Sequence, residues 1–90
     1  MNRSKIQTNI AILKTLANQG KTNPTHITYC TCLNHKCVTN ALSFLMDNNL
    51  VQEHNKNKRK KYSITDRGLK TLIVAKKIDT VLPIFNELYS

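Results

Sequence analysis

The stretch that decides the fold reads Tyr62-Ser63-Ile64-Thr65-Asp66-Arg67-Gly68-Leu69. Tyr62 and Ile64 alternate with a polar residue, which is typical of a half-buried strand. Thr65 is a residue type that caps helix N-termini, and Asp66 follows at a place where the helix dipole favours negative charge. The stretch therefore predicts a strand that passes directly into a helix.

A second short alternating segment, from Val51 to His54, precedes this strand. The strand itself is expected from about Lys60 to Thr65, and Val51 would lie on the same side as Tyr62 and Ile64. The two segments therefore predict a hairpin.

The connection of this hairpin is strongly cationic. Five of the six residues in the run Lys56-Asn57-Lys58-Arg59-Lys60-Lys61 are positively charged. The connection contains no glycine, so Asn55 and Asn57 are expected to supply any positive φ. A basic loop on a hairpin can place lysines against a polyanion, and a solvated, disordered loop is the alternative.

Two helices are expected at the start of the chain. The first runs from Arg3 to Asn18, and Gly20 stands where such a helix ends in the left-handed conformation. Asn23 is then a suitable cap for a short helix from about Pro24 to Cys30, because proline is favoured at the first helical position. The apolar stripe of the first helix is Ile6, Ile10, Leu13 and Ala17, widened by Ile12 and Leu16.

A third helix should follow a turn over residues 31–33. Asn34 can cap it, and Asn48 and Asn49 can take the left-handed conformation that ends it. The two sides of this helix differ in polarity. The inward stripe is Val38, Ala41, Leu42, Leu45 and Met46, and the opposite face is Lys36, Thr39, Asn40 and Ser43.

The last helix has apolar residues on two sides. Leu69, Leu72 and Ile73 form one stripe, which is expected to pack on the rest of the domain. Pro83 is expected to break the helix, leaving a helix to about Leu82 and a separate last turn. A second apolar set has the spacing of a coiled-coil seam, and we expect it to be a dimerisation surface; a helix folded back on its own domain is the alternative. This seam consists of Val74, Ile78, Val81, Phe85 and Leu88.

The charge balance of the 90-residue chain is strongly positive. Its formal net charge is +9, from 14 Lys and Arg against five Asp and Glu. Such an imbalance indicates a nucleic acid or another anionic surface as partner. The longest apolar run, Leu72 to Ala75, is too short to span a membrane, and residues 1–5 are not followed by a signal-peptide block. We therefore expect a cytoplasmic, nucleoid-associated protein with no membrane partner.

Three further segments matter beside the opening stretch: Ile10-Ala11-Ile12-Leu13 with Ala17-Asn18, Lys21-Thr22-Asn23-Pro24-Thr25-His26-Ile27, and Leu42 to Val51. With these segments the chain resembles the winged helix-turn-helix domains, in particular small archaeal DNA-binding proteins and predicted transcriptional regulators. The resemblance covers roughly Ile6 to Leu72. It implies an α+β, mainly helical fold of three helices and a two-stranded wing. Residues 1–68 would form the DNA-binding domain and residues 69–90 a dimerisation helix.

The resemblance also implies that the third helix enters the major groove and that the wing contacts phosphates. Asn can pair with adenine and Lys with guanine, so we expect Lys36 and Asn40 to contribute most. Phosphate contacts position the protein and carry little sequence information. The residues on the third helix would be Asn34, His35, Lys36, Thr39, Asn40 and Ser43. Those on the wing would be Lys56, Lys58, Arg59, Lys60 and Lys61.

Three cysteines lie in and around the turn of the helix-turn-helix, where the family usually has polar residues. Cys30, Cys32 and Cys37 are an odd number, and reduced thiols are expected. His26 and His35 are close in sequence, and three thiols with a histidine such as His35 offer zinc ligands, although the Cys-x-Cys-x4-Cys spacing lacks paired Cys-x-x-Cys units. Oxidant sensing is another alternative. We expect inert thiols, no metal and no cofactor.

Together these features predict a homodimeric transcriptional regulator that binds double-stranded DNA. A chromatin-like protein of low sequence specificity is the alternative within DNA binding. A protein-interaction module with a winged fold is the alternative outside it. We expect no enzymatic activity, because the sequence has no phosphate-cradling glycine loop, no nucleophile elbow and no close carboxylate pair.

Overall fold

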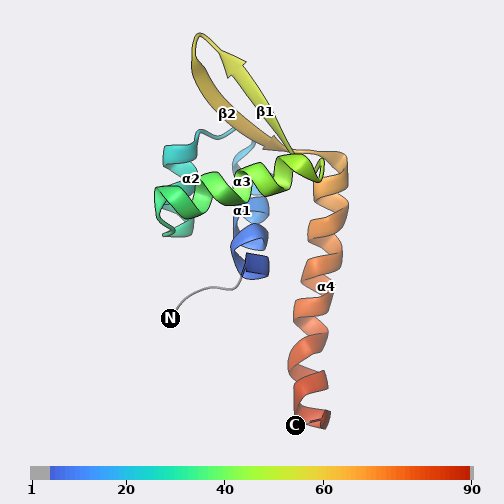
Figure 1. The fold of residues 1–90 in the computed structure, drawn as a ribbon. Coiled ribbons are helices and arrows are strands. Elements are labelled where there is room, and N and C mark those ends of the chain that lie inside the picture. Colours follow the sequence, from blue (N-terminus) through green and yellow to red (C-terminus); the bar gives the residue numbers. More distant parts are fainter. Residues whose placement is uncertain (1–4, 90) are drawn as a thin grey trace.

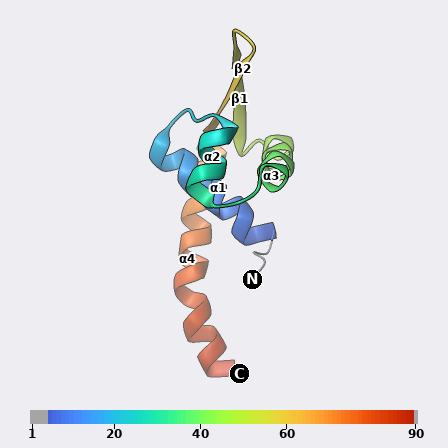
Figure 2. The same ribbon diagram turned by 90° about the vertical axis from the view of Figure 1, so that its left-hand side faces the viewer.

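The computed structural model describes the backbone of residues 5–89 and the side chains of residues 5–78. Its elements are α1 (Lys5–Gln19), α2 (Pro24–Thr31), α3 (His35–Asp47), β1 (Val51–Lys56), β2 (Arg59–Ile64) and α4 (Asp66–Tyr89). The first three helices form one cluster, the hairpin projects from it at one end, and α4 extends away at the other (Figure 1, Figure 2). The expected α+β, mainly helical arrangement of three helices, a wing and a C-terminal helix is confirmed.

Helix α1 lies at the centre of the core, where α2, α3, β2 and α4 all contact it. Its buried side chains are Ile12, Leu13 and Leu16. The predicted stripe was wrong for Ile6, which is 71% exposed, and for Ala17, which is also exposed. These two residues lie in the first and last turns of α1, whereas the neighbouring elements cover its middle. The predicted start at residue 3 lies outside the described residues.

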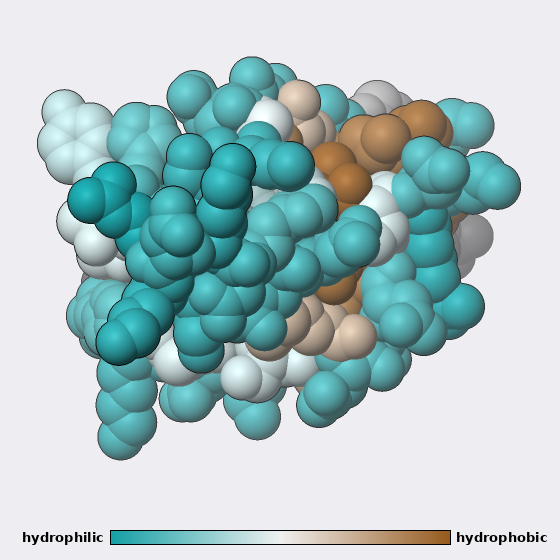
Figure 3. Space-filling view, turned by 90° about the horizontal axis from the view of Figure 1, so that it is seen from above, coloured by the Kyte–Doolittle hydropathy of each residue, from teal (hydrophilic) through white to brown (hydrophobic). Residues whose placement is uncertain are grey.

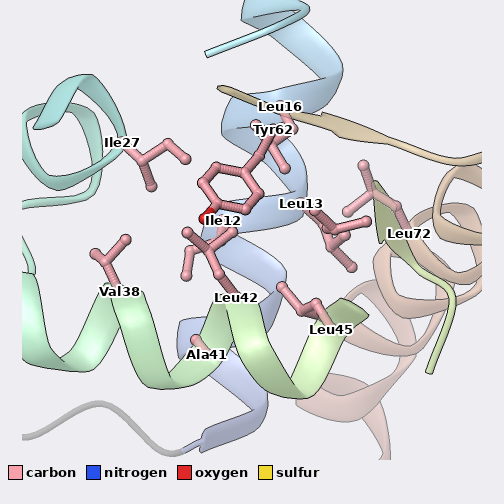
Figure 4. Close-up of a cluster of buried hydrophobic side chains, with 11 residues drawn as sticks. Ile12, Leu13, Leu16, Ile27, Val38, Ala41, Leu42, Leu45, Tyr62 and Leu72 are labelled. Atoms are coloured by element: carbon pink, nitrogen blue, oxygen red, sulfur yellow. The ribbon is translucent and has the colours of Figure 1, made fainter. Parts of the chain in front are cut away.

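Every other element adds to this core, and Figure 4 shows the side chains converging between α1, α3 and β2. The inward stripe predicted for α3 is confirmed, with Met46 half-buried at its edge. The buried apolar side chains outside α1 are Ile27, Val38, Ala41, Leu42, Leu45, Val51, Tyr62 and Leu72.

Polar caps and left-handed residues set the ends of the helices. The side-chain oxygens of Asn23 and Asn34 each accept a hydrogen bond from the amide three residues on, at 2.8 Å in both cases. Gly20 and Asn49 have φ values of 74° and 60°, which confirms the left-handed conformation predicted for them. The same prediction was wrong for Asn48, whose φ is −99° because it still closes the last turn of α3, its amide donating to the main-chain oxygen of Phe44. Cys32 ends α2 with a φ of 57°, which the sequence pattern did not indicate.

The hairpin is antiparallel, with register from Val51 opposite Ile64 to Lys56 opposite Arg59. Thr22 pairs with the outer edge of β2, because its amide and carbonyl exchange hydrogen bonds with those of Tyr62 at 2.9 and 2.8 Å. Val51 and Tyr62 are buried at the base of the hairpin. The base is therefore fixed to the core, and the outer half projects from it.

A two-residue turn at Asn57 and Lys58 closes the hairpin, with φ values of 53° and 62°. Two consecutive positive φ values suit the twist of a hairpin. The prediction for Asn57 is confirmed, but that for Asn55 was wrong, because Asn55 is paired with Lys60 inside the sheet. The strands pair further toward the tip than expected and leave only two residues for the turn.

Helix α4 begins at the predicted cap. The hydroxyl oxygen of Thr65 accepts a hydrogen bond from the amide of Gly68 at 3.0 Å, and Asp66 lies in the first turn. Gly68 is buried against Leu50 and Ile64. This contact determines where α4 leaves the domain.

Among the described apolar side chains of α4, those of residues 66–78, only Leu72 is buried in the core. Leu72 is buried, but Leu69 is exposed and Ile73 is 54% exposed, so the prediction that all three pack on the domain was wrong for two of them. The reason is that α4 extends away from the helical cluster, so its neighbours cover little of its surface (Figure 1). Val74 and Ile78 are 55% and 51% exposed.

The rest of the seam lies in the last part of α4. The side chains of Val81, Phe85 and Leu88 lie outside the described residues. The predicted break after Leu82 was wrong, because α4 continues through Pro83 to Tyr89. The missing amide hydrogen of Pro83 removes one hydrogen bond from α4 without ending the helix. Within the described part of the chain, no helix combines the length and the apolar character needed to cross a membrane.

Candidate nucleic-acid interface

One side of α3 is polar and faces solvent. Lys36, Thr39, Asn40 and Ser43 are all exposed. Their spacing of three and four residues places them on one face of the helix. The opposite face is held in the core, so α3 presents these four side chains from a rigid support.

Two other predicted residues lie at the N-terminus of α3. Asn34 is exposed, but its side-chain oxygen already accepts the amide hydrogen of Cys37 at 2.8 Å. Its role within the fold is therefore to cap α3. His35 is exposed, and its main-chain oxygen accepts a hydrogen bond from the hydroxyl of Thr39 at 2.9 Å.

The register of the hairpin divides the cations of the wing between two faces. Directly opposed residues share a face, and the faces alternate along each strand. His54 is opposite Lys61, and Lys56 is opposite Arg59, so these four side chains share one face, which we call the cationic face. The second face carries Glu53, Asn55, Lys60 and Tyr62.

The second face contains an ion pair. Nζ of Lys60 lies 3.5 Å from Oε1 of Glu53, and the hydroxyl of Tyr62 donates to the same oxygen at 3.4 Å. Burial raises the pKa of Tyr62, and the negative charge of Glu53 raises it further, so the phenol stays protonated. An exposed pair of this kind adds little stability, but it balances the charge of Lys60.

Lys21 joins the cationic face from outside the wing. Its neighbour Thr22 pairs with Tyr62, which brings the loop between α1 and α2 alongside β2. A surface hollow of about 630 Å³ results, and none of its described lining residues is acidic. The hollow is lined by Lys21, His54, Lys56, Asn57, Arg59 and Lys61. Seen from above, the wing end of the molecule is mostly hydrophilic (Figure 3).

Sequence reasoning missed Lys21 as a candidate. Its only signal was its place in the segment from Lys21 to Ile27 that contributed to the family resemblance. The pairing of Thr22 with Tyr62 joins residues 40 positions apart, and no local pattern indicates such a contact.

A groove between α1 and α3 was also missed. It has a volume of about 480 Å³ and borders the polar face of α3 at Asn40. Ile6 and Phe44 line it and are both exposed. Phe44 is off the inward stripe of α3, which was the available signal.

The three cysteines are free thiols on the surface. The sulfur of Cys30 lies 3.4 Å from Nε2 of His26, one of the two histidines that are close to the thiols in the sequence. Among the described residues, no three His, Cys, Asp or Glu side chains are grouped closely enough to hold a metal ion. The alternative of a zinc site from Cys30, Cys32, Cys37 and His35 therefore has no support in the geometry.

Solved structures share this fold. Sso10a-2, a DNA-binding protein from Sulfolobus solfataricus, is 25% identical, with a TM-score of 0.76 over 97% of this chain and 86% of that protein. A MarR family transcriptional regulator from Silicibacter pomeroyi is 17% identical, with a TM-score of 0.69 over 92% of this chain and 53% of the regulator. BpsR from Bordetella bronchiseptica is 14% identical, with a TM-score of 0.71 over 89% of this chain and 55% of BpsR. The chain thus spans little more than half the length of these last two proteins.

No curated protein matches the sequence. A family model described as winged helix-turn-helix matches residues 2–82, which include the three helices, the wing and most of α4. The expected relationship is confirmed: this chain belongs to the winged helix-turn-helix family.

Proposed function

We propose that the protein is a homodimeric transcriptional regulator that binds double-stranded DNA. Helix α3 enters the major groove, and the wing at residues 55–61 lies against phosphates beside it. Residues 1–68 bind DNA and residues 69–90 join two copies. The role needs no cofactor and no catalytic step, and it is carried out in the cytoplasm on the nucleoid.

The polar face of α3 is the observation that carries this proposal. An α-helix fits the major groove, where Lys can donate to guanine, Asn can pair with adenine, and Ser or Thr can contact either. Lys36, Asn40 and Ser43 lie in one line along the exposed side of α3. Four buried side chains on the other side hold the helix in place.

Charge gives independent support for a nucleic-acid partner. The formal net charge is +9, and the hollow beside the wing is lined by cations without a described acidic residue. A cationic surface of this kind attracts the phosphates of DNA and makes binding dependent on salt. The 25% identity with Sso10a-2, a DNA-binding protein, agrees with this partner.

The described part of the α4 seam supports the homodimer. Val74 and Ile78 are more than half exposed in the single chain, and they are one helical turn apart. Apolar side chains at this spacing suit a partner helix. An identical copy supplies a matching seam.

Selection from a random duplex library tests the proposal. Enrichment of a defined motif is the expected result for a regulator. Tight binding to bulk DNA without an enriched motif would favour the chromatin-like protein of low sequence specificity. The high net charge makes that protein class the second candidate. If the purified protein binds no duplex at low salt, DNA binding itself is wrong and the protein-interaction module becomes the leading function.

The α3 face also makes a prediction about single residues. Replacing Asn40 with alanine should weaken binding to the selected motif by about 5- to 150-fold, because a good bidentate base contact is worth about 1–3 kcal/mol. Lys36→Ala should have an effect in the same range and relax the preference for guanine at its position. Fluorescence anisotropy on the motif and on a scrambled duplex measures both effects.

Asn18→Ala is the matched control, because Asn18 is an exposed asparagine on α1. It should leave both affinities unchanged. An Asn40→Ala protein that binds the motif as well as the unaltered chain does would contradict the role of α3.

A further inference from the structure

The hollow beside the wing is built from three separate segments of the chain. Lys21 comes from the loop between α1 and α2, Lys56 from β1, and Arg59 and Lys61 from β2. His54 also lines it, with Nε2 of its ring 2.6 Å from the hydroxyl oxygen of Ser63. The fold thus brings together charges from distant parts of the sequence.

This arrangement is electrostatically unfavourable in the isolated chain. Lys56 lies directly opposite Arg59, and like charges at opposed positions of a hairpin destabilise it. Glu53 is the acidic residue of the hairpin, and it lies on the other face, where it pairs with Lys60. A bound anion would relieve the repulsion on the cationic face.

We propose that the hollow is a binding site for a phosphate group, held by Lys21, Arg59 and Lys61. Arg59 offers a planar fork of donors that matches two phosphate oxygens, and the lysines add point charges. The proposal deepens the proposed function, on which it rests, by assigning phosphate contact to one face of the wing and to a residue outside it. The phosphate can belong to the DNA backbone or to a free phosphorylated molecule, since both present the same oxygens.

The first experiment compares single charge removals on the two faces. Lys61→Gln and Lys21→Gln remove charges from the hollow. Lys60→Gln removes a charge from the adjacent residue on the opposite face, and Lys14→Gln removes one from the exposed surface of α1. The dissociation constant for a duplex is measured by fluorescence anisotropy at several chloride concentrations.

The slope of log K against log salt is negative. Each hollow variant should reduce its magnitude by about 0.9, because the protein then neutralises one phosphate fewer. Lys60→Gln should reduce the magnitude less, and Lys14→Gln should not change it. The face assignment is overturned for DNA if Lys60→Gln reduces the magnitude as much as Lys61→Gln, or if Lys21→Gln leaves it unchanged.

The second experiment uses inorganic pyrophosphate without DNA. Isotope-labelled protein is titrated at constant ionic strength, and amide shifts are followed by NMR. A saturable shift at Lys21, His54 and Lys61 that Lys61→Gln abolishes supports a free phosphorylated ligand. Slopes of smaller magnitude in the DNA experiment without such a shift support the DNA backbone as the source.

The two proposals can fail separately. If the unaltered protein binds no DNA but pyrophosphate binds in the hollow, the proposed function is wrong and the phosphate site stands. If DNA binds but neither experiment singles out the hollow, the phosphate site is wrong and DNA binding stands.

Discussion

Replacing Gly68 with alanine is expected to lower the free energy of unfolding by about 3 kcal/mol, the upper end of the usual cost of overpacking. A Cβ there would overlap the main-chain oxygen of Leu50 and lie 2.6 Å from Cγ1 of Ile64. The oxygen of Leu50 cannot rotate away, and it also accepts a hydrogen bond from the amide of Thr65 at 3.1 Å. The start of α4 would have to move away from the turn that follows α3. Urea denaturation monitored by circular dichroism measures the loss.

Gly20→Ala is the matched control, because it adds the same methyl group where no atom lies within 4 Å. Its cost should be about 1 kcal/mol, since the φ of 74° is left-handed and alanine adopts that region poorly. The difference of about 2 kcal/mol should separate the melting temperatures by roughly 8–16 °C. Equal destabilisation by the two substitutions would mean that close packing is not the reason why position 68 requires glycine.

The second large effect is expected at the α4 seam, where Ile78→Lys should convert the proposed dimer into a monomer. Fully burying an isoleucine contributes about 1.5–3 kcal/mol, and because Ile78 is 51% exposed in the single chain, association gains about half of that. A symmetric dimer loses this contribution twice, so the dissociation constant should rise about 10- to 150-fold from lost burial alone. The new lysines would also place two charges in the interface. Light scattering at micromolar concentration should then report the monomer mass.

Ile73→Lys is the control for this change. Ile73 is on the same helix and is 54% exposed, against 51% for Ile78, but it precedes Val74 by one residue and therefore points about 100° away from the seam. The same substitution there should leave the dimer intact. A monomeric unaltered protein, or a dimer that dissociates with Ile73→Lys and survives Ile78→Lys, would contradict the seam.

Most of the fold could be predicted because its signals are local. Asn23, Asn34 and Thr65 cap the helices that follow them, and each cap is encoded within four residues. The inward stripe of α3 could be predicted equally well, because one side of that helix is buried along its length. The stripe of α1 was predicted less well, because neighbouring elements cover the middle of that helix on several sides and leave its first and last turns exposed.

The candidate site was harder to predict because its chemistry depends on register. The sequence shows a run of cations at residues 56–61 but not which of them share a face. A hairpin that closes on Asn57 and Lys58 fixes the pairs, places Lys60 near Glu53, and places Lys61 opposite His54. The contribution of Lys21 depends on a pairing between distant residues. Such contacts follow from the folded core and cannot be inferred from spacing.

The attachment of the wing at only one end has a consequence for hydrogen exchange and for binding entropy. The base is held by buried Val51 and Tyr62 and by the bridge to Thr22, whereas the outer half is a two-stranded ribbon whose side chains are all exposed from Asn55 to Lys61. An isolated two-stranded ribbon is only marginally stable, and local opening is easiest where few apolar contacts must be broken. The amide hydrogens at the tip should therefore exchange with solvent through local fraying. Those at the base should exchange only through global unfolding. Contact with a polyanion would suppress that fraying. Ordering the ribbon has an entropic cost, which offsets part of the interaction energy and so reduces the affinity.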